Sequence, residues 1–313
     1  MTRLVPHASH WGSYRAVVDG DRLVGVEPHP DDPDPSPLLA NVADTVRSPA
    51  RVAAPTVRRG WWEDGPGPDE RRGADEWLEV GWDEVLDRLA VDLGRVVAVH
   101  GPASLYAGSY GWASAGRFHH AQSQLRRFTG LLGGATVSLG TYSTGAAERI
   151  LPHVVGSAEE LWRGATSWSV VARHTDLLVA FGGLPAKNSF VSPGGVTRHV
   201  VRSHLAQAAA RGMRIVYFSP LADDVAADLG AEWHALRPGT DVAVMLGLAH
   251  TLIVEGRADL DFCARYCVGT DRLVAYVLGS ADGIPKTPEW AEGLSEIPAS
   301  TIRALARAMA GTR

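Results

Sequence analysis

The sequence predicts an α/β protein: a small β-rich N-terminal module, then βα units, then a doubly wound parallel sheet like that of a dinucleotide-binding domain. Three observations support this class. Two β-leaning runs flank a tight turn within 12–28, two strand–loop–helix units occupy 104–150, and strands alternate with helices from residue 176 onward. Alternation of this kind is typical of a parallel sheet with helices on both faces.

The first predicted elements are a hairpin and one helix. GSYRAVVDG and DRLVGVEPH, within 12–28, favour β structure and meet at an Asp-Gly-Asp turn. Residues 29–75 are dense in Pro, Asp, Arg and Gly, and we expect them to be irregular but ordered because their tryptophans need somewhere to pack. A helix is predicted over 83–97, with Asp83 as its N-cap.

Two similar units follow, each a short strand, a polar loop and a helix. They comprise strand 104–107, loop GSYGW (108–112) and helix 114–132, then strand 135–139, loop GTYST (140–144) and helix 145–150. If the two strands are neighbours, both polar loops leave the carboxyl ends of adjacent strands. These loops are therefore candidates for a binding site.

The last part of the chain alternates strands and helices. The predicted elements are strand 176–181, helix 195–210, strand 214–218, helix 223–229, strand 232–236 and helix 241–255, then helices 261–268, 270–278 and 299–310. The strands end in GGLPAKNS (182–189), SPLADD (219–224) and RPGTD (237–241). Ligands of doubly wound sheets bind beyond such ends. Because no strand follows the final helix, the array is interpreted as cut off, with a natural terminal helix as the alternative.

Composition excludes several classes of protein. The 30 Lys and Arg against 35 Asp and Glu give a net charge of −5 without a basic run, which disfavours a nucleic-acid partner. The apolar stretch 242–254 is too short to span a bilayer, and the first residues lack the apolar core of a signal peptide. Cys263 and Cys267 cannot form a disulfide framework or a full set of metal ligands. We therefore expect a cytoplasmic protein without membrane contact.

The residues alone give a positional prediction of the ligand. GxGxxG, GxxxxGK[ST], HExxH and GxSxG are absent, but three turn-rich strand ends and Lys187 favour a phosphate- or nucleotide-bearing ligand. The alternative is that turns anywhere use such residues. Ser143 precedes a helix, so N-capping is its expected role, with ligand binding the lesser alternative. Tyr110 and Trp112 share one loop and fit either half-buried packing or a ligand site.

Longer strings resemble a known family. They are HWGSYR, DPDPSPL, GSYGWASAGRFHHAQSQLRRF, TYSTGAAERILPHVVG, RPGTDVAVMLGLAHTLI and PKTPEWAEGLSEIPASTI. In this order they resemble the molybdopterin oxidoreductases of the dimethyl-sulfoxide reductase family, and within it the biotin sulfoxide and trimethylamine-N-oxide reductase branch. The resemblance runs from about residue 9 to the end of the chain.

The resemblance implies a molybdenum centre held by bis(molybdopterin guanine dinucleotide). Ser143 in TYSTG matches the one protein ligand to the metal, and a hard alkoxide suits an oxophilic metal that already has four sulfur ligands. Tyr110 and Trp112 match the aromatic pair beside the oxo group, where each can donate a hydrogen bond. Many relatives carry an N-terminal cysteine cluster for an iron–sulfur centre; this chain has none.

The resemblance also assigns the nucleotide contacts to the three strand ends. These residues are Lys187, Asn188 and Ser189, then Ser219 and Pro220, then Gly239, Thr240 and Asp241. Asp241 is suited to accept the N1–H and N2–H₂ donors of guanine. On this basis we expect three domains: a β-rich module at 1–55, an α/β domain with the molybdenum-site loops at 56–170, and an incomplete nucleotide-binding domain at 171–313.

The implied activity is the reduction of an S- or N-oxide by oxygen-atom transfer to Mo(IV). Biotin sulfoxide or methionine sulfoxide leads as the expected substrate, followed by trimethylamine N-oxide or dimethyl sulfoxide, with an unidentified electron donor. Members of this branch are more than twice as long, so a missing C-terminal half is expected as a partner. The alternatives are an inactive, cofactor-free N-terminal fragment and a relative of formate dehydrogenase or nitrate reductase.

Overall fold

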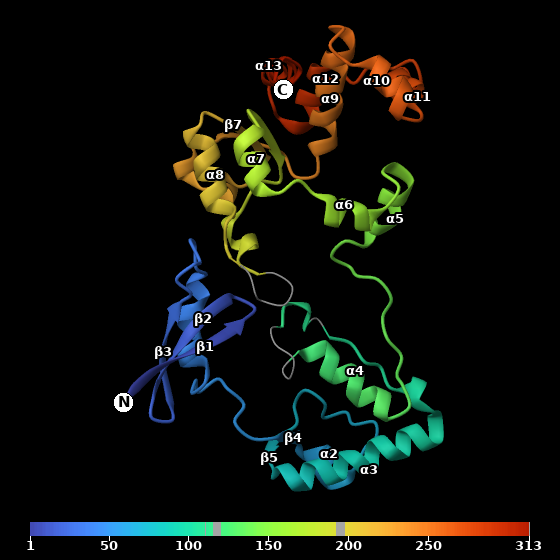
Figure 1. Ribbon diagram of the computed structural model, residues 1–313. Helices are drawn as coiled ribbons and strands as arrows, with labels where there is room; N and C mark the ends of the chain where they lie inside the picture. The colour runs from blue at the N-terminus through green and yellow to red at the C-terminus, as the bar shows by residue number, and fades with distance from the viewer. Residues whose placement is uncertain (110, 115–119, 192–197, 313) are drawn as a thin grey trace. The chain divides into compact units, whose positions relative to one another are not determined.

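A computed structural model describes residues 1–109, 111–114, 120–191 and 198–312, and it has the predicted α/β class (Figure 1). The chain divides into two compact units. The first comprises Met1–Gly164 and Phe190–His199, and the second comprises Ala165–Ser189 and Val200–Arg313. The division into three domains stays a prediction.

The first unit begins with a three-stranded antiparallel sheet. Its strands are β1 (Thr2–Ser9), β2 (Gly12–Asp19) and β3 (Arg22–Pro28). The predicted hairpin is β2–β3, while β1 was not predicted because Pro6 is unusual within a strand. Proline is tolerated there because β1 lies at the edge of the sheet. Tyr14 and Ala16 on β2 pack with Leu39 of the turn η1 (Pro37–Ala40), which precedes α1 (Asn41–Thr45).

A buried hydrogen-bonded pair, Asp32 and His199, joins this module to the segment that ends the unit. His199 is 1% exposed, and its ring Nδ1 lies 2.7 Å from Oδ2 of Asp32. The backbone N–H of His199 donates to Oδ1 of Asp32 over 3.1 Å, and its Nε2 lies 3.2 Å from the carbonyl oxygen of Phe190. Every polar atom of the imidazole thus has a partner. This ring thus links Phe190 and His199 to the loop that carries Asp32.

Replacing His199 with Ala should destabilise the first unit strongly, because it leaves the buried carboxylate of Asp32 without its partner. Loss of one member of a buried pair costs roughly 3–5 kcal/mol. Urea unfolding followed by tryptophan fluorescence measures the change. His199→Asn keeps a donor near Asp32 and should lose less than His199→Ala. Equal stability of the wild type and His199→Ala would contradict the assignment.

Two aromatic side chains hold the longest helix of the first unit. The short strands β4 (Thr56–Arg58) and β5 (Trp77–Glu79) pair antiparallel around α2 (Arg59–Asp64), and α3 (Trp82–His100) follows. The guanidinium of Arg88 on α3 lies over the rings of Trp61 and Trp62, at 5.0 and 4.8 Å from their centroids. Trp61 and Trp62 pack as expected, whereas Trp77 is 66% exposed.

The predicted cap of this helix was wrong by two residues. Gly81 holds the N-cap position of α3, and Asp83 lies within the first turn. A carboxylate in the first turn still interacts favourably with the positive end of the helix. The sequence signal therefore marked the start of the helix but assigned the wrong role to Asp83.

The two βα units are present with very short strands. Tyr106 and Thr136 form a single parallel bridge, in which the N–H of Ala107 donates to the carbonyl oxygen of Thr136 over 2.8 Å. The strands 104–107 and 135–139 are thus neighbours, as expected, but are reduced to this bridge. The helices that follow are α4 (Ala121–Leu131), α5 (Gly145–Val154) and α6 (Ala158–Gly164). Residues 115–119, at the predicted start of helix 114–132, lie outside the described residues.

The second unit contains a parallel sheet covered on both faces. Its strands β6 (Leu177–Phe181), β7 (Arg214–Ser219) and β8 (Glu232–Ala235) lie in that order. Alternate residues of β7 point to opposite faces: Val216 and Phe218 belong to one buried cluster, and Ile215 and Tyr217 to another. The cluster of Val216 and Phe218 lies under α9 (Asp241–Val254), α12 (Pro288–Ser295) and α13 (Ala299–Gly311). The cluster of Ile215 and Tyr217 lies under α7 (Trp168–His174) and α8 (Val201–Ala210). The doubly wound prediction is confirmed.

Two predictions in this unit were wrong. The expected helix at 223–229 is replaced by two 3₁₀ turns, η5 (Ala222–Asp224) and η6 (Ala227–Leu229), because Asp224 is bonded into the neighbouring loop. Helix α12 was not predicted, although Thr287 caps it by accepting from the N–H of Trp290 over 3.1 Å. The predicted helices at 261–268 and 270–278 are α10 (Leu260–Tyr266) and α11 (Thr270–Val277).

Candidate functional site in the second unit and loops of the first

The three predicted strand-end loops lie at the same end of the sheet in the second unit, where the carboxyl ends of its strands are. The parallel register pairs Phe181 with Phe218, and Ser219 with Ala235. Hydrogen bonds continue past the strands: the N–H of Gly182 donates to the carbonyl oxygen of Phe218 over 2.9 Å. The indole N–H of Trp233 donates to the carbonyl oxygen of Ser219 over 2.8 Å. The structure therefore brings the residues predicted at 187–189, 219–220 and 239–241 to the same side of the sheet.

Asp224 joins two of these loops, a role that its position in the sequence did not predict. Its carbonyl oxygen accepts from the N–H of Leu184 over 2.7 Å. Its carboxylate accepts from the hydroxyl of Ser219, which in turn accepts from the N–H of Leu221 over 3.1 Å. Ser219 is 1% exposed, so its hydroxyl serves the loop itself. The signal available in the sequence was the acidic pair that ends SPLADD.

Gly183 is required where these two loops touch. Its φ is +77°, and a Cβ built there would lie 2.4 Å from Cβ of Asp224 and 2.9 Å from its carbonyl oxygen. Gly182, with φ +89°, has nothing within 4 Å of such a Cβ. The two adjacent glycines therefore differ in one respect. Gly182 supplies only backbone conformation, whereas Gly183 also supplies the space that Asp224 occupies.

This difference predicts unequal effects of alanine at the two glycines. Gly182→Ala should cost about 1–2 kcal/mol, the strain of an L-residue at positive φ. Gly183→Ala should cost roughly 1–3 kcal/mol more, because the methyl group displaces Asp224. Thermal unfolding of both variants measures the difference. Equal melting temperatures would show that the contact between Gly183 and Asp224 does not constrain the loops.

The loops at this carboxyl end of the sheet have polar groups that are free for a ligand. Lys187, in the 3₁₀ turn η4 (Ala186–Ser189), is exposed and forms no ion pair within the described part of the chain. Gly239 has open space around it, and α9 starts directly afterwards. A free helix N-terminus favours a phosphate group, and a lysine that follows another strand at the same end of the sheet adds positive charge there. Asp241 is half-buried, without a hydrogen-bond partner for its carboxylate among the described residues.

The side chains of Ser189 and Thr240 are used within their own loops. The hydroxyl of Ser189 donates to the carbonyl oxygen of Ala186 over 2.7 Å, and that of Thr240 to the carbonyl oxygen of Arg237 over 2.6 Å. Both bonds close a turn. A hydroxyl that donates within its loop can still accept a hydrogen bond from a ligand.

A row of aromatic rings crosses the three strands close to these loops. Phe181, Phe218 and His234 stand at matching positions on β6, β7 and β8, with centroid separations of 4.9 and 5.2 Å along the row. Burial lowers the pKa of His234, since desolvation disfavours the imidazolium. A neutral ring stacks on Phe218 without bringing a charge into the apolar interior. Stacked rings thus lie along the sheet beneath the three loops.

In the first unit, Ser143 is exposed and does not cap a helix. Thr144 holds the N-cap position of α5, and its hydroxyl donates to Oε1 of Glu148 over 2.8 Å. The hydroxyl of Ser143 has no hydrogen-bond partner among the described residues, and the neighbouring Tyr142 is 100% exposed. The N-cap interpretation of Ser143 was therefore wrong. Its hydroxyl is free to bind a ligand.

The other predicted loop residue of the first unit is also exposed. Trp112 lies in the turn η3 (Gly111–Ala113) and is 48% exposed. A Cβ on Gly111 would lie 2.5 Å from Cβ of Ala121, so this turn packs tightly against the start of α4. Tyr110 lies outside the described residues.

No helix in the part of the chain that the structure describes combines the length and apolarity needed to cross a bilayer.

Comparison with known proteins places the chain in a family. Residues 51–272 match the family model of molybdopterin oxidoreductases, and residues 7–47 match that of the molybdopterin oxidoreductase N-terminal domain. This chain belongs to the molybdopterin oxidoreductase family. The resemblance inferred from the sequence strings is thereby confirmed.

Its relatives include reductases of S- and N-oxides. The chain is 40% identical over 304 residues to the dimethyl sulfoxide/trimethylamine N-oxide reductase of Rhodobacter capsulatus, covering 97% of this chain and 37% of that protein. It is 42% identical over 291 residues to the biotin sulfoxide reductase of Cereibacter sphaeroides, covering 93% and 39%. The chain thus spans less than two fifths of these relatives. It also shares its fold with acetylene hydratase from Pelobacter acetylenicus, at 22% identity and a TM-score of 0.59, covering 96% of this chain and 38% of that one.

Proposed function

We propose that this chain is the part of a molybdenum-dependent S- or N-oxide reductase that contributes a serine ligand and one nucleotide site. The observation that carries the proposal is the common carboxyl end of β6, β7 and β8, where Lys187, Gly239 and the start of α9 are available to phosphate. The relatives named above act on dimethyl sulfoxide, trimethylamine N-oxide and biotin sulfoxide. Biotin sulfoxide or methionine sulfoxide leads as the substrate.

The residues at the carboxyl end of this sheet fit a guanine dinucleotide. The exposed ammonium of Lys187 and the N–H groups at the start of α9 suit the pyrophosphate, and Gly239 lets the backbone approach it closely. The carboxylate of Asp241 suits the N–H donors of guanine. In the proposal Asn188 and Pro220 add contacts, while Ser219 acts through Asp224 to shape the loop.

The loops of the first unit would serve the metal. Ser143 offers a hydroxyl that no described residue binds, and Trp112 offers a half-exposed indole ring. When bound, the molybdenum group supplies the two-electron chemistry by which an oxygen atom leaves the oxide. Tyr110 and Trp112 would donate hydrogen bonds to the transferred oxygen and so stabilise the charge that develops on it. An electron donor and the rest of the longer protein complete the proposal.

The second candidate function is a cofactor-free fragment that keeps the fold alone. The chain covers 37% of the Rhodobacter capsulatus relative, and this share favours the candidate. Production in a host that makes the cofactor, followed by assay of molybdenum and guanine nucleotide, separates the two. We expect nucleotide to co-purify with the chain. A protein with neither component would support the fragment.

Asp241→Ala should weaken nucleotide retention. An unpaired guanine donor costs roughly 1–3 kcal/mol, whereas loss of the charge from the first turn of α9 costs about 0.3–1 kcal/mol of stability. Nucleotide released after denaturation of the purified protein is quantified by chromatography. Val242→Ala changes an exposed neighbour in the same turn and should retain nucleotide fully. Full occupancy in Asp241→Ala would refute the guanine contact.

Ser143→Ala and Ser143→Cys should leave folding unchanged within about 0.5 kcal/mol, because the hydroxyl is exposed and caps nothing. In a chain completed to the length of the relatives, both variants should bind pterin, show altered molybdenum spectra and reduce oxides slowly. Thr144→Ala alters the true N-cap residue and serves as the control, with spectra like those of the wild type. Native spectra in both Ser143 variants would exclude the serine as a ligand.

A further inference from the structure

The only two cysteines of the chain lie four residues apart at the end of α10. The backbone N–H of Cys267 donates to the carbonyl oxygen of Cys263 over 2.9 Å, which is the hydrogen bond of one helical turn. Side chains at this spacing lie on the same face of a helix. Both thiols are free, with Cys263 half-buried and Cys267 exposed. The chain therefore has a thiol pair that solvent can reach.

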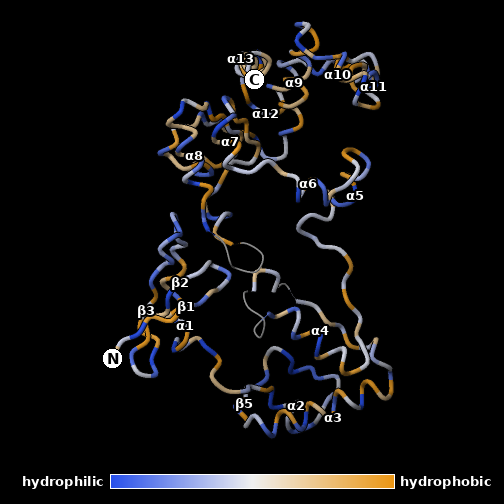
Figure 2. Tube along the Cα trace, viewed as in Figure 1, coloured by the Kyte–Doolittle hydropathy of each residue, from blue (hydrophilic) through white to orange (hydrophobic). Residues whose placement is uncertain are grey.

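This thiol pair is far from the proposed nucleotide site. Helices α10 and α11 follow α9 and lie apart from the strands of the sheet (Figure 1). A helix rises about 1.5 Å per residue, so α9 places its last residue, Val254, about 20 Å from Asp241. Hydrophobic and hydrophilic residues alternate along α10 and α11 (Figure 2), and neither helix contributes to the two buried clusters of the sheet. Chemistry at the pair is thus separable from the nucleotide loops.

The two thiols interact with each other. Partial burial raises the pKa of the Cys263 thiol, and the sulfur of Cys267 raises it further, both as a like charge and as a hydrogen-bond partner. Asp259 has a smaller effect in the same direction. The carboxylate of Asp259 accepts from the N–H of Phe262 over 2.8 Å and so caps the other end of α10. At the C-terminal end of the helix, the sulfur atoms are partners of each other.

The helical geometry suits an ion between the sulfur atoms better than a bond between them. Side chains four residues apart on a helix have Cβ atoms roughly 5–6 Å apart, whereas a disulfide needs Cβ atoms about 3.5–4.5 Å apart. Closing a disulfide would therefore distort the last turn of α10 and its hydrogen bond from Cys267 to Cys263. An ion bound to both sulfur atoms adds the length of two metal–sulfur bonds, so the turn can stay intact.

The lack of further ligands selects the kind of ion. Within the described parts of the chain, no group of three or more His, Cys, Asp or Glu side chains could hold a metal ion. Structural zinc takes a tetrahedron of ligands, so a thiol pair alone does not suit it. Thiolates are soft ligands that select Cu(I). This ion has a filled d shell and is stable between two sulfur atoms in a line.

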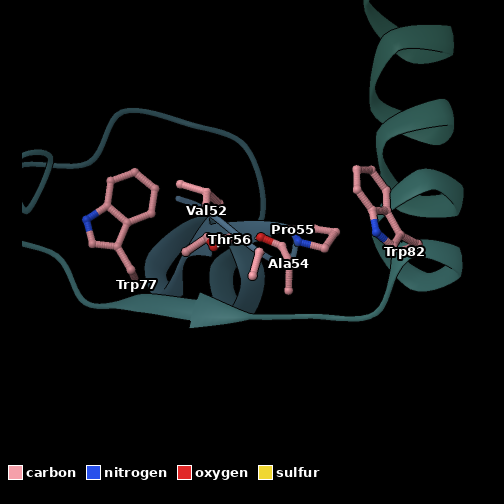
Figure 3. Close-up of a pocket in the computed structure, with 7 residues that line it drawn as sticks. Val52, Ala54, Pro55, Thr56, Trp77 and Trp82 are labelled. Carbon is pink, nitrogen blue, oxygen red and sulfur yellow. Dashed lines mark hydrogen bonds between the residues drawn. The ribbon is translucent and has the colours of Figure 1, made fainter. Parts of the chain in front are cut away.

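The groove of the first unit lacks such ligands. It has a volume of about 560 Å³, and Figure 3 shows the indoles of Trp77 and Trp82 on either side of residues 52–56. None of the residues that line the groove carries a thiol, an imidazole or a carboxylate. An apolar surface of this composition does not provide the soft donor atoms that Cu(I) needs.

We propose that Cys263 and Cys267 form a two-coordinate site for Cu(I), a site that the proposed reductase function does not require. On binding, both S–H bonds break, two S–Cu bonds form and two protons pass to the solvent. Copper and sulfur keep their oxidation states, so the step needs no oxidant or reductant. Because the ligands must lose their protons, the affinity for Cu(I) increases with pH.

The test is a titration of the reduced chain, produced without molybdenum, with Cu(I) in the absence of oxygen. The coloured chelator bicinchoninate competes for the ion and suppresses binding to single donors. We expect one copper ion per chain in native mass spectrometry, with a mass that shows the loss of two protons. Cys263→Ser and Cys267→Ser should each weaken binding roughly a hundredfold or more, because a chelate becomes a single donor.

Two controls separate the spacing of the thiols from their number. Cys263→Ser combined with Arg265→Cys keeps two thiols but places them two residues apart, where helical side chains do not face each other. It should bind Cu(I) as weakly as the single serine variants. Arg265→Ala keeps the pair, although it removes a guanidinium that donates to the carbonyl oxygen of Asp261 over 3.2 Å. Its affinity should stay within about twofold of the wild type. Circular dichroism verifies that each variant is folded.

Three outcomes would overturn the proposal. The wild type could bind Cu(I) no more tightly than the serine variants, the variant with displaced thiols could bind as tightly as the wild type, or copper could link two chains through Cys267 alone. Nucleotide retention should be the same in all these variants. Failure here would leave the proposed reductase function standing, and failure of that function would leave the copper site standing.

Discussion

Parallel pairing of β6, β7 and β8 is the constraint on which the candidate nucleotide site depends. The register aligns Phe181, Phe218 and His234, so the chain leaves all three strands at the same level and on the same side. The strands cannot slide, because alternate residues of β7 are buried on opposite faces and a one-residue slip would exchange them. The loops inherit their positions from this register. A sheet of the same composition with antiparallel pairing would scatter them to both ends.

Buried polar contacts then specify how each loop turns. Apolar clusters under α8 and α9 hold the sheet but are not directional. Asp224 is directional, since its carbonyl oxygen and its carboxylate bind two different loops. The pair of Asp32 and His199 does the same in the first unit. Such groups are costly to leave unpaired, so they favour one loop geometry over its near alternatives.

The sequence predicted the periodic part of the fold well and the specific contacts poorly. Strands β6, β7 and β8 were found to within a residue or two because apolar runs and glycine-rich turns mark them locally. Asp224 was assigned to a helix because its partners, Leu184 and Ser219, depend on tertiary structure that propensity does not encode. Helix α12 was missed despite a Thr-Pro start. Ser143 was placed as a cap from its position before α5, although Thr144 holds that position.

The shortness of β8 has a consequence for behaviour in solution. Among the described residues β8 is an edge strand, and the backbone groups on its outer side could pair with a strand of another molecule. It has only four residues, and it begins with Glu232, whose carboxylate binds the guanidinium of Arg214 on β7. A short edge that starts with a charge offers few register-matched hydrogen bonds to an incoming strand. The sheet can therefore stay open at this side, with its loops accessible, without becoming a template for aggregation.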